Sequence, residues 1–239
     1  MKLLVLILGG AVMLAQPSEA HAKLRAAAMS LPAELAGAER LPVTGRQGWK
    51  RVERLAYGAF RVSEVRRSLT KGGSLHIIIY DGAKARQTFG FRVAEDEGEA
   101  WRGEAETTAR RRALNVGVEV EMRNRSAFGA RLAPEARPEE AWLLKLGETR
   151  ERPLAGTLER GGQVVTVRGT NRLAGTPLPL GETAGYVFSL ADRPLAAVEV
   201  INDGAVWLAP DLPAELRGPV TSAIASLLLF EELRRTFPE

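Results

Sequence analysis

The hydrophobic pattern is most pronounced near the C-terminus, where residues 186–208 read YVFSLADRPLAAVEVINDGAVWL. Short runs of apolar and β-branched residues separated by turn residues predict three consecutive strands. Asp203 and Gly204 suit a two-residue type I′ turn, because both tolerate the positive φ that this turn needs. The pairs expected across the turn are Asn202–Ala205, Ile201–Val206, Val200–Trp207 and Glu199–Leu208.

Both faces of this predicted hairpin are apolar. An antiparallel strand with one face in water alternates apolar and polar residues, so we expect the hairpin to be covered on both sides. The segment 219–237 has apolar residues at helical spacing and predicts an amphipathic helix with Pro219 near its start. We expect this helix to cover one face of the hairpin and other strands to cover the second. The predicted apolar stripe comprises Val220, Ala223, Ile224, Leu227, Leu228, Phe230, Leu233 and Phe237.

Strand patterns also fill the middle of the chain. Residues 74–93 predict a hairpin around Asp81-Gly82, and residues 101–110 alternate small or apolar with charged residues, as in a strand with one wet face. With the remaining patterns this gives roughly nine or ten short strands and no long crossover helix. The predicted fold is mainly β, an antiparallel meander forming a barrel or a sandwich, with the C-terminal amphipathic helix packed on it. The Pro-rich stretch 175–181 is interpreted as a loop within one domain.

The N-terminus predicts export. Lys2 precedes an apolar run from Leu3 to Ala15, and residues 20–22 (Ala-His-Ala) form a small-x-small cleavage pattern, which together indicate a signal peptide over residues 1–22. The apolar run is shorter than the ~20 residues that span a bilayer, so no transmembrane segment is expected after cleavage. Residues 23–48 form an N-terminal segment with one short helix near Pro32, and residues 49–239 form a single β-rich domain.

Composition fits a folded, exported protein. The 239 residues are 45% hydrophobic and 26% charged, which excludes a disordered chain. There is no cysteine, so disulfides and thiolate chemistry are excluded and the core alone must stabilise the fold. A bacterial envelope protein, periplasmic or extracellular, matches this composition better than a disulfide-rich secreted one.

The charge is nearly balanced, with 33 Lys and Arg against 29 Asp and Glu. Basic clusters are nevertheless present, and two interpretations stay open. They form a solvated sheet face paired with nearby glutamates, or they contact anionic envelope components, including a membrane surface. Nucleic acid is not expected, because no strand combines aromatic and basic residues as RNA-binding sheets do. The clusters are Arg61, Arg66, Arg67 and Lys71; Arg110, Arg111 and Arg112; and Arg123 and Arg125.

Few residues are suited to catalysis. His76 is the single histidine after residue 22, which excludes a multi-histidine metal site, and it is expected to be a structural strand residue. No nucleophile elbow, zinc-protease or phosphate-loop motif occurs. The sequence therefore indicates no catalytic residue, no metal and no cofactor.

Glu199 is the acid that stands out, because it lies between Val198 and Val200 on the hairpin expected to be covered on both sides. One interpretation is a functional acid, either a polar anchor at the bottom of a ligand cavity or half of a carboxylate pair. The other is a structural residue, either in a salt bridge with an arginine or at a strand end that reaches water. The tryptophans fall at inward strand positions or at a strand start, where core packing explains them.

The sequence thus favours a non-enzymatic binding module for a small apolar ligand or a cell-envelope component. The first alternative is a structural or accessory protein that docks a partner through its charged sheet face. A carboxylate-based hydrolase using Glu199 is the second. The candidate binding residues are Glu199, Arg110, Arg111 and Arg112.

Overall fold

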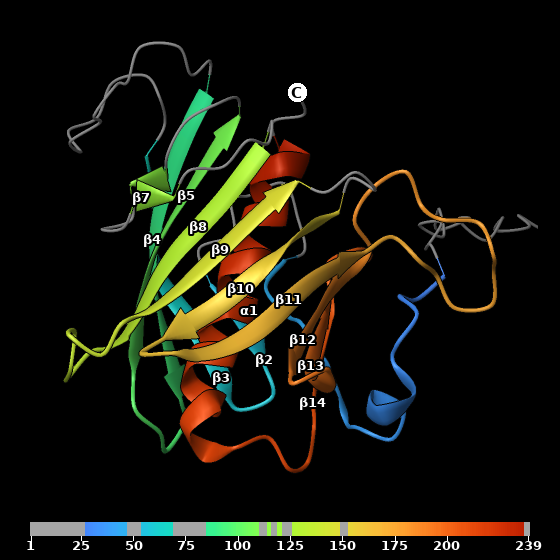
Figure 1. Cartoon of the computed structure of the whole chain (residues 1–239), viewed down its shortest axis with the longest axis horizontal. Helices are drawn as coiled ribbons and strands as arrows, with labels where there is room; N and C mark the ends of the chain where they lie inside the picture. The colour runs from blue at the N-terminus through green and yellow to red at the C-terminus, as the bar shows by residue number, and fades with distance from the viewer. Residues whose placement is uncertain are drawn as a thin grey trace, which may run out of the picture.

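The structure is a computed structural model that describes residues 27–46, 54–68, 85–109, 114–115, 119–120, 126–148 and 153–236. Within these residues, one antiparallel sheet of 12 strands runs in the order β1-β14-β13-β12-β11-β10-β9-β8-β5-β4-β3-β2, and β6 and β7 form a separate pair (Figure 1). The strands of the large sheet are β1 (Arg40–Pro42), β2 (Leu55–Tyr57), β3 (Phe60–Ser68), β4 (Ala85–Glu95), β5 (Trp101–Ala109), β8 (Ser126–Pro134), β9 (Trp142–Glu148), β10 (Leu154–Arg160), β11 (Gln163–Thr170), β12 (Gly185–Leu190), β13 (Arg193–Glu199) and β14 (Ala205–Leu208). The small pair comprises β6 (Leu114–Asn115) and β7 (Glu119–Val120).

The sheet nearly closes into a barrel. Its two edge strands, β1 and β2, approach each other through an isolated antiparallel bridge between Thr44 and Ala56. The Thr44 N–H donates to the Ala56 carbonyl at 2.9 Å, and the Ala56 N–H donates back to Thr44 at 3.1 Å. The mainly-β antiparallel fold predicted from the sequence is confirmed, in the form of a barrel rather than two packed sheets.

Helix α1 (Ala214–Thr236) runs along the concave side of this sheet (Figure 1). Every residue from Pro219 to Phe230 is buried. A helix that is enclosed on all sides needs apolar or small residues on every face. The predicted amphipathic helix, with one apolar stripe, is therefore an incomplete description of residues 219–230. The helix also begins five residues before the predicted start, which places Pro219 inside it.

The N-terminal half of α1 is held inside the barrel by a hydrogen bond from strand β2. The Tyr57 hydroxyl donates to the Thr221 carbonyl at 2.7 Å. Burial raises the pKa of this phenol far above its ordinary value, so Tyr57 stays a neutral donor. The principal strand contacts of α1 are with β5, β8 and β10 in the middle of the sheet, and not with the C-terminal hairpin as expected.

The register predicted for the C-terminal hairpin is wrong. Glu199 faces Ala205 and Ala197 faces Trp207, a shift of three residues from the expected pairing. The connection is a five-residue loop, residues 200–204, whose turn is closed by the Gly204 N–H donating to Ile201 at 3.0 Å. Because the shift is odd, Trp207 points to the opposite face from the one predicted.

Both faces of the hairpin are covered, as predicted, but the outer face is covered by an element that was not expected there. The inner face, with Val198 and Val206, belongs to the same core as α1. The outer face, with Ala197 and Trp207, is covered by the N-terminal segment through Met29 and Leu35. Within this segment the predicted short helix is a single 3-10 turn, η1 (Ala33–Leu35), and β1 pairs with β14.

Two other turns have the geometry expected of tight hairpins. Ala191 and Asp192, between β12 and β13, both have positive φ, as do Gly161 and Gly162 between β10 and β11. The stretch 175–181 is a loop, as interpreted from the sequence. The predicted signal peptide (1–22), the first strand of the hairpin around Asp81-Gly82, His76 and Trp49 lie outside the described residues.

Candidate functional site

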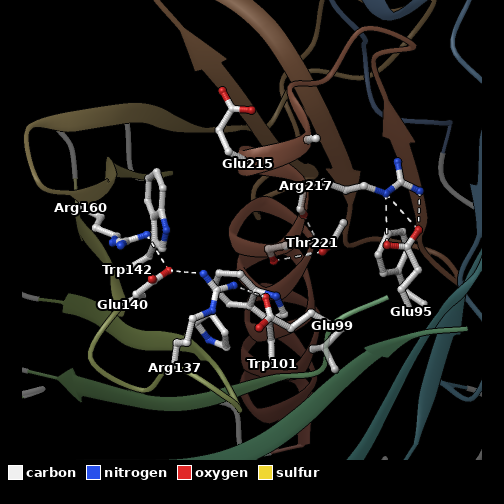
Figure 2. Close-up of a pocket in the computed structure, with 15 residues that line it drawn as sticks. Glu95, Glu99, Trp101, Arg137, Glu140, Trp142, Arg160, Glu215, Arg217 and Thr221 are labelled. Carbon is white, nitrogen blue, oxygen red and sulfur yellow. Dashed lines mark hydrogen bonds and ion pairs between the residues drawn. The ribbon is translucent and has the colours of Figure 1, made fainter. Parts of the chain in front are cut away.

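The candidate site is a pocket at one end of the barrel, beside the N-terminal end of α1 (Figure 2). Successive antiparallel strands run in opposite directions, so one rim collects alternate strand starts and strand ends. Here it collects the starts of β3, β5 and β9 and the ends of β4, β8 and β10. We call the resulting space of about 310 Å³ the mouth pocket. Its lining residues are Phe60, Val93, Glu95, Glu99, Trp101, Pro134, Arg137, Glu140, Trp142, Arg160, Ala214, Glu215, Arg217, Gly218 and Thr221.

One side of the mouth pocket is built from a row of ion pairs. The Arg137 Nη2 atom donates to Glu99 at 2.8 Å and its Nη1 atom donates to Glu140 at 2.8 Å. Arg160 lies 3.3 Å from the same Glu140 oxygen, so this carboxylate sits between two guanidinium groups (Figure 2). The hydrogen bond to Glu99, followed by the charges of Glu140 and Glu99, raises the pKa of Arg137. Arg137 therefore stays a cation throughout the accessible pH range.

The other side is a bidentate pair between α1 and β4. Arg217 Nη2 donates to Glu95 Oε1 at 2.6 Å, and Arg217 Nε donates to Glu95 Oε2 at 3.2 Å. The guanidinium carbon also lies 5.2 Å from the centre of the Phe60 ring. Planar guanidinium groups suit both a carboxylate and an aromatic face, so Arg217 is fixed in orientation although its side chain is 43% exposed.

Aromatic rings form the apolar part of the wall. Trp101 is 9% exposed and Trp142 is 2% exposed. Gly218 allows α1 to approach Trp101 closely, because a Cβ at this position would lie 2.4 Å from the indole Cε2 atom. Behind them the barrel is filled by α1, so the pocket ends near Thr221 and does not continue as a tunnel along the helix.

Glu199, the acid selected from the sequence, does not line the mouth pocket. It is 2% exposed, on the outer face of β13 beneath the N-terminal segment. Its Oε2 atom accepts from the backbone N–H of Met29 at 2.8 Å, and Asn202 lies 3.5 Å from Oε1. Arg46 secures the same segment by donating from Nη2 to the Val200 carbonyl at 3.0 Å. The contacts of Glu199 are those of a structural anchor.

Arg110, Arg111 and Arg112, the other candidate binding residues, lie outside the described residues, as do Lys71, Arg123 and Arg125. Among the arginines of the outer sheet face that are described, several are paired with acids. Arg92 lies 3.1 Å and Arg102 lies 2.9 Å from Glu135. Arg102 and Arg66 both approach Glu64, at 3.4 Å and 3.9 Å. This part of the charged face is a solvated network of ion pairs, the first of the two interpretations given above.

Sequence reasoning missed the mouth pocket. The signal was present in part, since Trp101 and Trp142 each open a predicted strand and both are therefore candidates for the same rim. In the described ranges, no group of three or more His, Asp or Glu side chains could hold a metal ion. In the part of the chain that the structure describes, no helix is long and apolar enough to cross a membrane.

The chain shows no similarity to a protein-family model, to a curated protein or to a solved structure. Its function is therefore argued from the mouth pocket itself.

Proposed function

We propose that this protein is an exported, non-enzymatic binding module that holds a small cell-envelope component in the mouth pocket. The single observation that supports this most is the contrast between a filled barrel and an open rim. Helix α1 occupies the interior, whereas the rim keeps a space of about 310 Å³ lined by aromatic rings and oriented polar groups. Small-molecule sites combine apolar walls with fixed polar groups, and in this pocket the polar groups predominate, since seven of the fifteen lining residues are charged.

The volume of the pocket limits the size of the ligand that it can hold. Its volume lies near the lower end of the ~300–1,000 Å³ range of ligand pockets. A long acyl chain would need the space that α1 fills, so a compact ligand with apolar and hydrogen-bonding parts fits better. Export rests on the N-terminal signal pattern of residues 1–22.

The proposal is tested by recovering the ligand. Protein purified from its native host is extracted with organic solvent and aqueous acid, and the extracts are analysed by mass spectrometry. The test variant is Ala214→Trp, which places a large ring at the pocket wall from an exposed position. Its matched control is Ala36→Trp, an exposed alanine beside η1 that does not line the pocket.

We expect a co-purifying molecule with the wild-type protein and with Ala36→Trp, and its loss with Ala214→Trp. Circular dichroism of both variants shows whether the fold is kept. The proposal is wrong if no molecule co-purifies, or if a folded Ala214→Trp variant retains as much of it as the control.

A further inference from the structure

The charges of the mouth pocket indicate what kind of ligand it takes. Four glutamates and three arginines line it. Each arginine is already paired with a carboxylate: Arg137 with Glu99 and Glu140, Arg160 with Glu140, and Arg217 with Glu95. A charged ligand group would have to displace a partner of the same charge from one of these pairs, so it would gain little Coulomb energy beyond that of the exposed pair it replaces.

Glu215 is the remaining acid, and it offers little to a cationic ligand. It is exposed and lies in the first turn of α1, where the positive end of the helix dipole already favours a carboxylate. An anion would meet three arginines whose charge is neutralised by neighbouring glutamates. The pocket therefore favours a ligand without net charge.

The paired groups can still make hydrogen bonds. A guanidinium group has five N–H donors and a carboxylate has about four acceptor positions. The contacts with Glu99 and Glu140 use one N–H of each terminal nitrogen of Arg137. A ring of such groups, fixed in place by its own ion pairs, suits adjacent hydroxyl groups that each donate and accept.

The aromatic wall supplies the complementary apolar contact. Trp101, Trp142 and Phe60 line the pocket together with Pro134, and because the three rings are 9%, 2% and 3% exposed, the apolar contact that they offer is small. A pyranose ring presents weakly positive C–H groups on its faces and hydroxyl groups around its edge. This distribution matches a pocket with rings in the wall and ion pairs at the rim.

We infer that the mouth pocket binds a neutral saccharide unit. This inference rests on the proposed binding function and names the chemical class of the ligand. Three single-ring probes of similar size separate the possibilities: N-acetylglucosamine is neutral, glucosamine is a cation and glucuronate is an anion. A fourth probe, 1-octanol, is apolar without a sugar ring.

Titration of the ¹⁵N-labelled full chain, followed through the indole N–H signals, is the test. We expect N-acetylglucosamine to shift the signals of Trp101 and Trp142 but not that of Trp207, with a dissociation constant about tenfold lower than those of the charged sugars. Arg137→Gln should raise this constant about tenfold. The matched control, Arg66→Gln, changes a 79% exposed arginine on the outer face and should leave it unchanged.

Tighter or equal binding of either charged sugar would overturn the inference. A response to 1-octanol alone would also overturn it, while leaving the proposed binding function intact. If none of the four probes shifts the two indole signals and no molecule co-purifies with the wild-type protein, both proposals fail together.

Discussion

Two regions of this molecule each combine a tryptophan, a glutamate and an arginine, but in different surroundings. On the outer face of β13 and β14, Trp207 and Glu199 lie beneath the N-terminal segment, and the guanidinium carbon of Arg40 lies 5.9 Å from the centre of the Trp207 ring. At the mouth pocket, Trp101 lies near Glu99 and Arg137, whose paired side chains are 36% and 50% exposed (Figure 2). The first region is covered by the N-terminal segment, whereas the second borders the mouth pocket.

The two regions differ in the groups that pair with their glutamate carboxylates. Glu199 accepts a hydrogen bond from a backbone N–H that is itself buried, so this contact ties two parts of the chain together. The mouth glutamates instead pair with arginines whose side chains are 41–50% exposed. Exposed ion pairs contribute little to folding, so we expect the mouth pairs to add less to the stability of the fold than the buried contact of Glu199.

The largest effect should come from the ring in the closed region. Trp207 is 5% exposed and packs against Met29, Leu35 and Ala197. Trp207→Ala should lower the free energy of unfolding by about 3–5 kcal/mol, because it leaves a cavity under the N-terminal segment. Urea denaturation measures this value, with the exposed Val164→Ala as control. A loss below about 1 kcal/mol would mean that the segment does not cover Trp207 in solution.

The anchoring role of Glu199 should produce the next largest effect. Glu199→Ala leaves the buried N–H of Met29 without this acceptor, which should cost about 1–3 kcal/mol. Glu199→Gln keeps an oxygen acceptor at the same place and should cost less. Hydrogen exchange localises the change, since protection of the Met29 amide should fall in the alanine variant. Unchanged protection in that variant would contradict the anchoring role.

The two regions also differ in how far sequence could predict them. Local patterns identified β3, β5, β10 and β11 through their period of two, and the three C-terminal strands through short apolar runs between turn residues. Strand β8 was missed: its sequence, SAFGARLAP, is rich in Ala and Gly, which have low strand propensity. It forms because Phe128 and Leu132 are buried between neighbouring strands and α1. Tertiary packing, rather than local propensity, therefore stabilises strand β8.

The hairpin register was predicted wrongly for a related reason. Asp203-Gly204 is a good local turn signal, but the observed pairing places Val198 and Val206 against the core and the small Ala197 and Ala205 under the N-terminal segment. Burial on two faces outweighs one turn preference. The mouth pocket was beyond sequence reasoning, because its walls meet only once strand order and barrel closure are known.

The smallest effect should come from the open region. Arg217→Gln removes the bidentate pair with Glu95 and the contact with Phe60, at a side chain that is 43% exposed. We expect a loss of about 1 kcal/mol or less, and it should shrink in 1 M NaCl because salt screens exposed charges. Urea denaturation of wild type and variant at low and high salt measures both quantities. A loss as large as that of Glu199→Ala, and insensitive to salt, would place the mouth ion pairs among the structural contacts. The distinction between a closed anchor and an open recognition site would then be wrong.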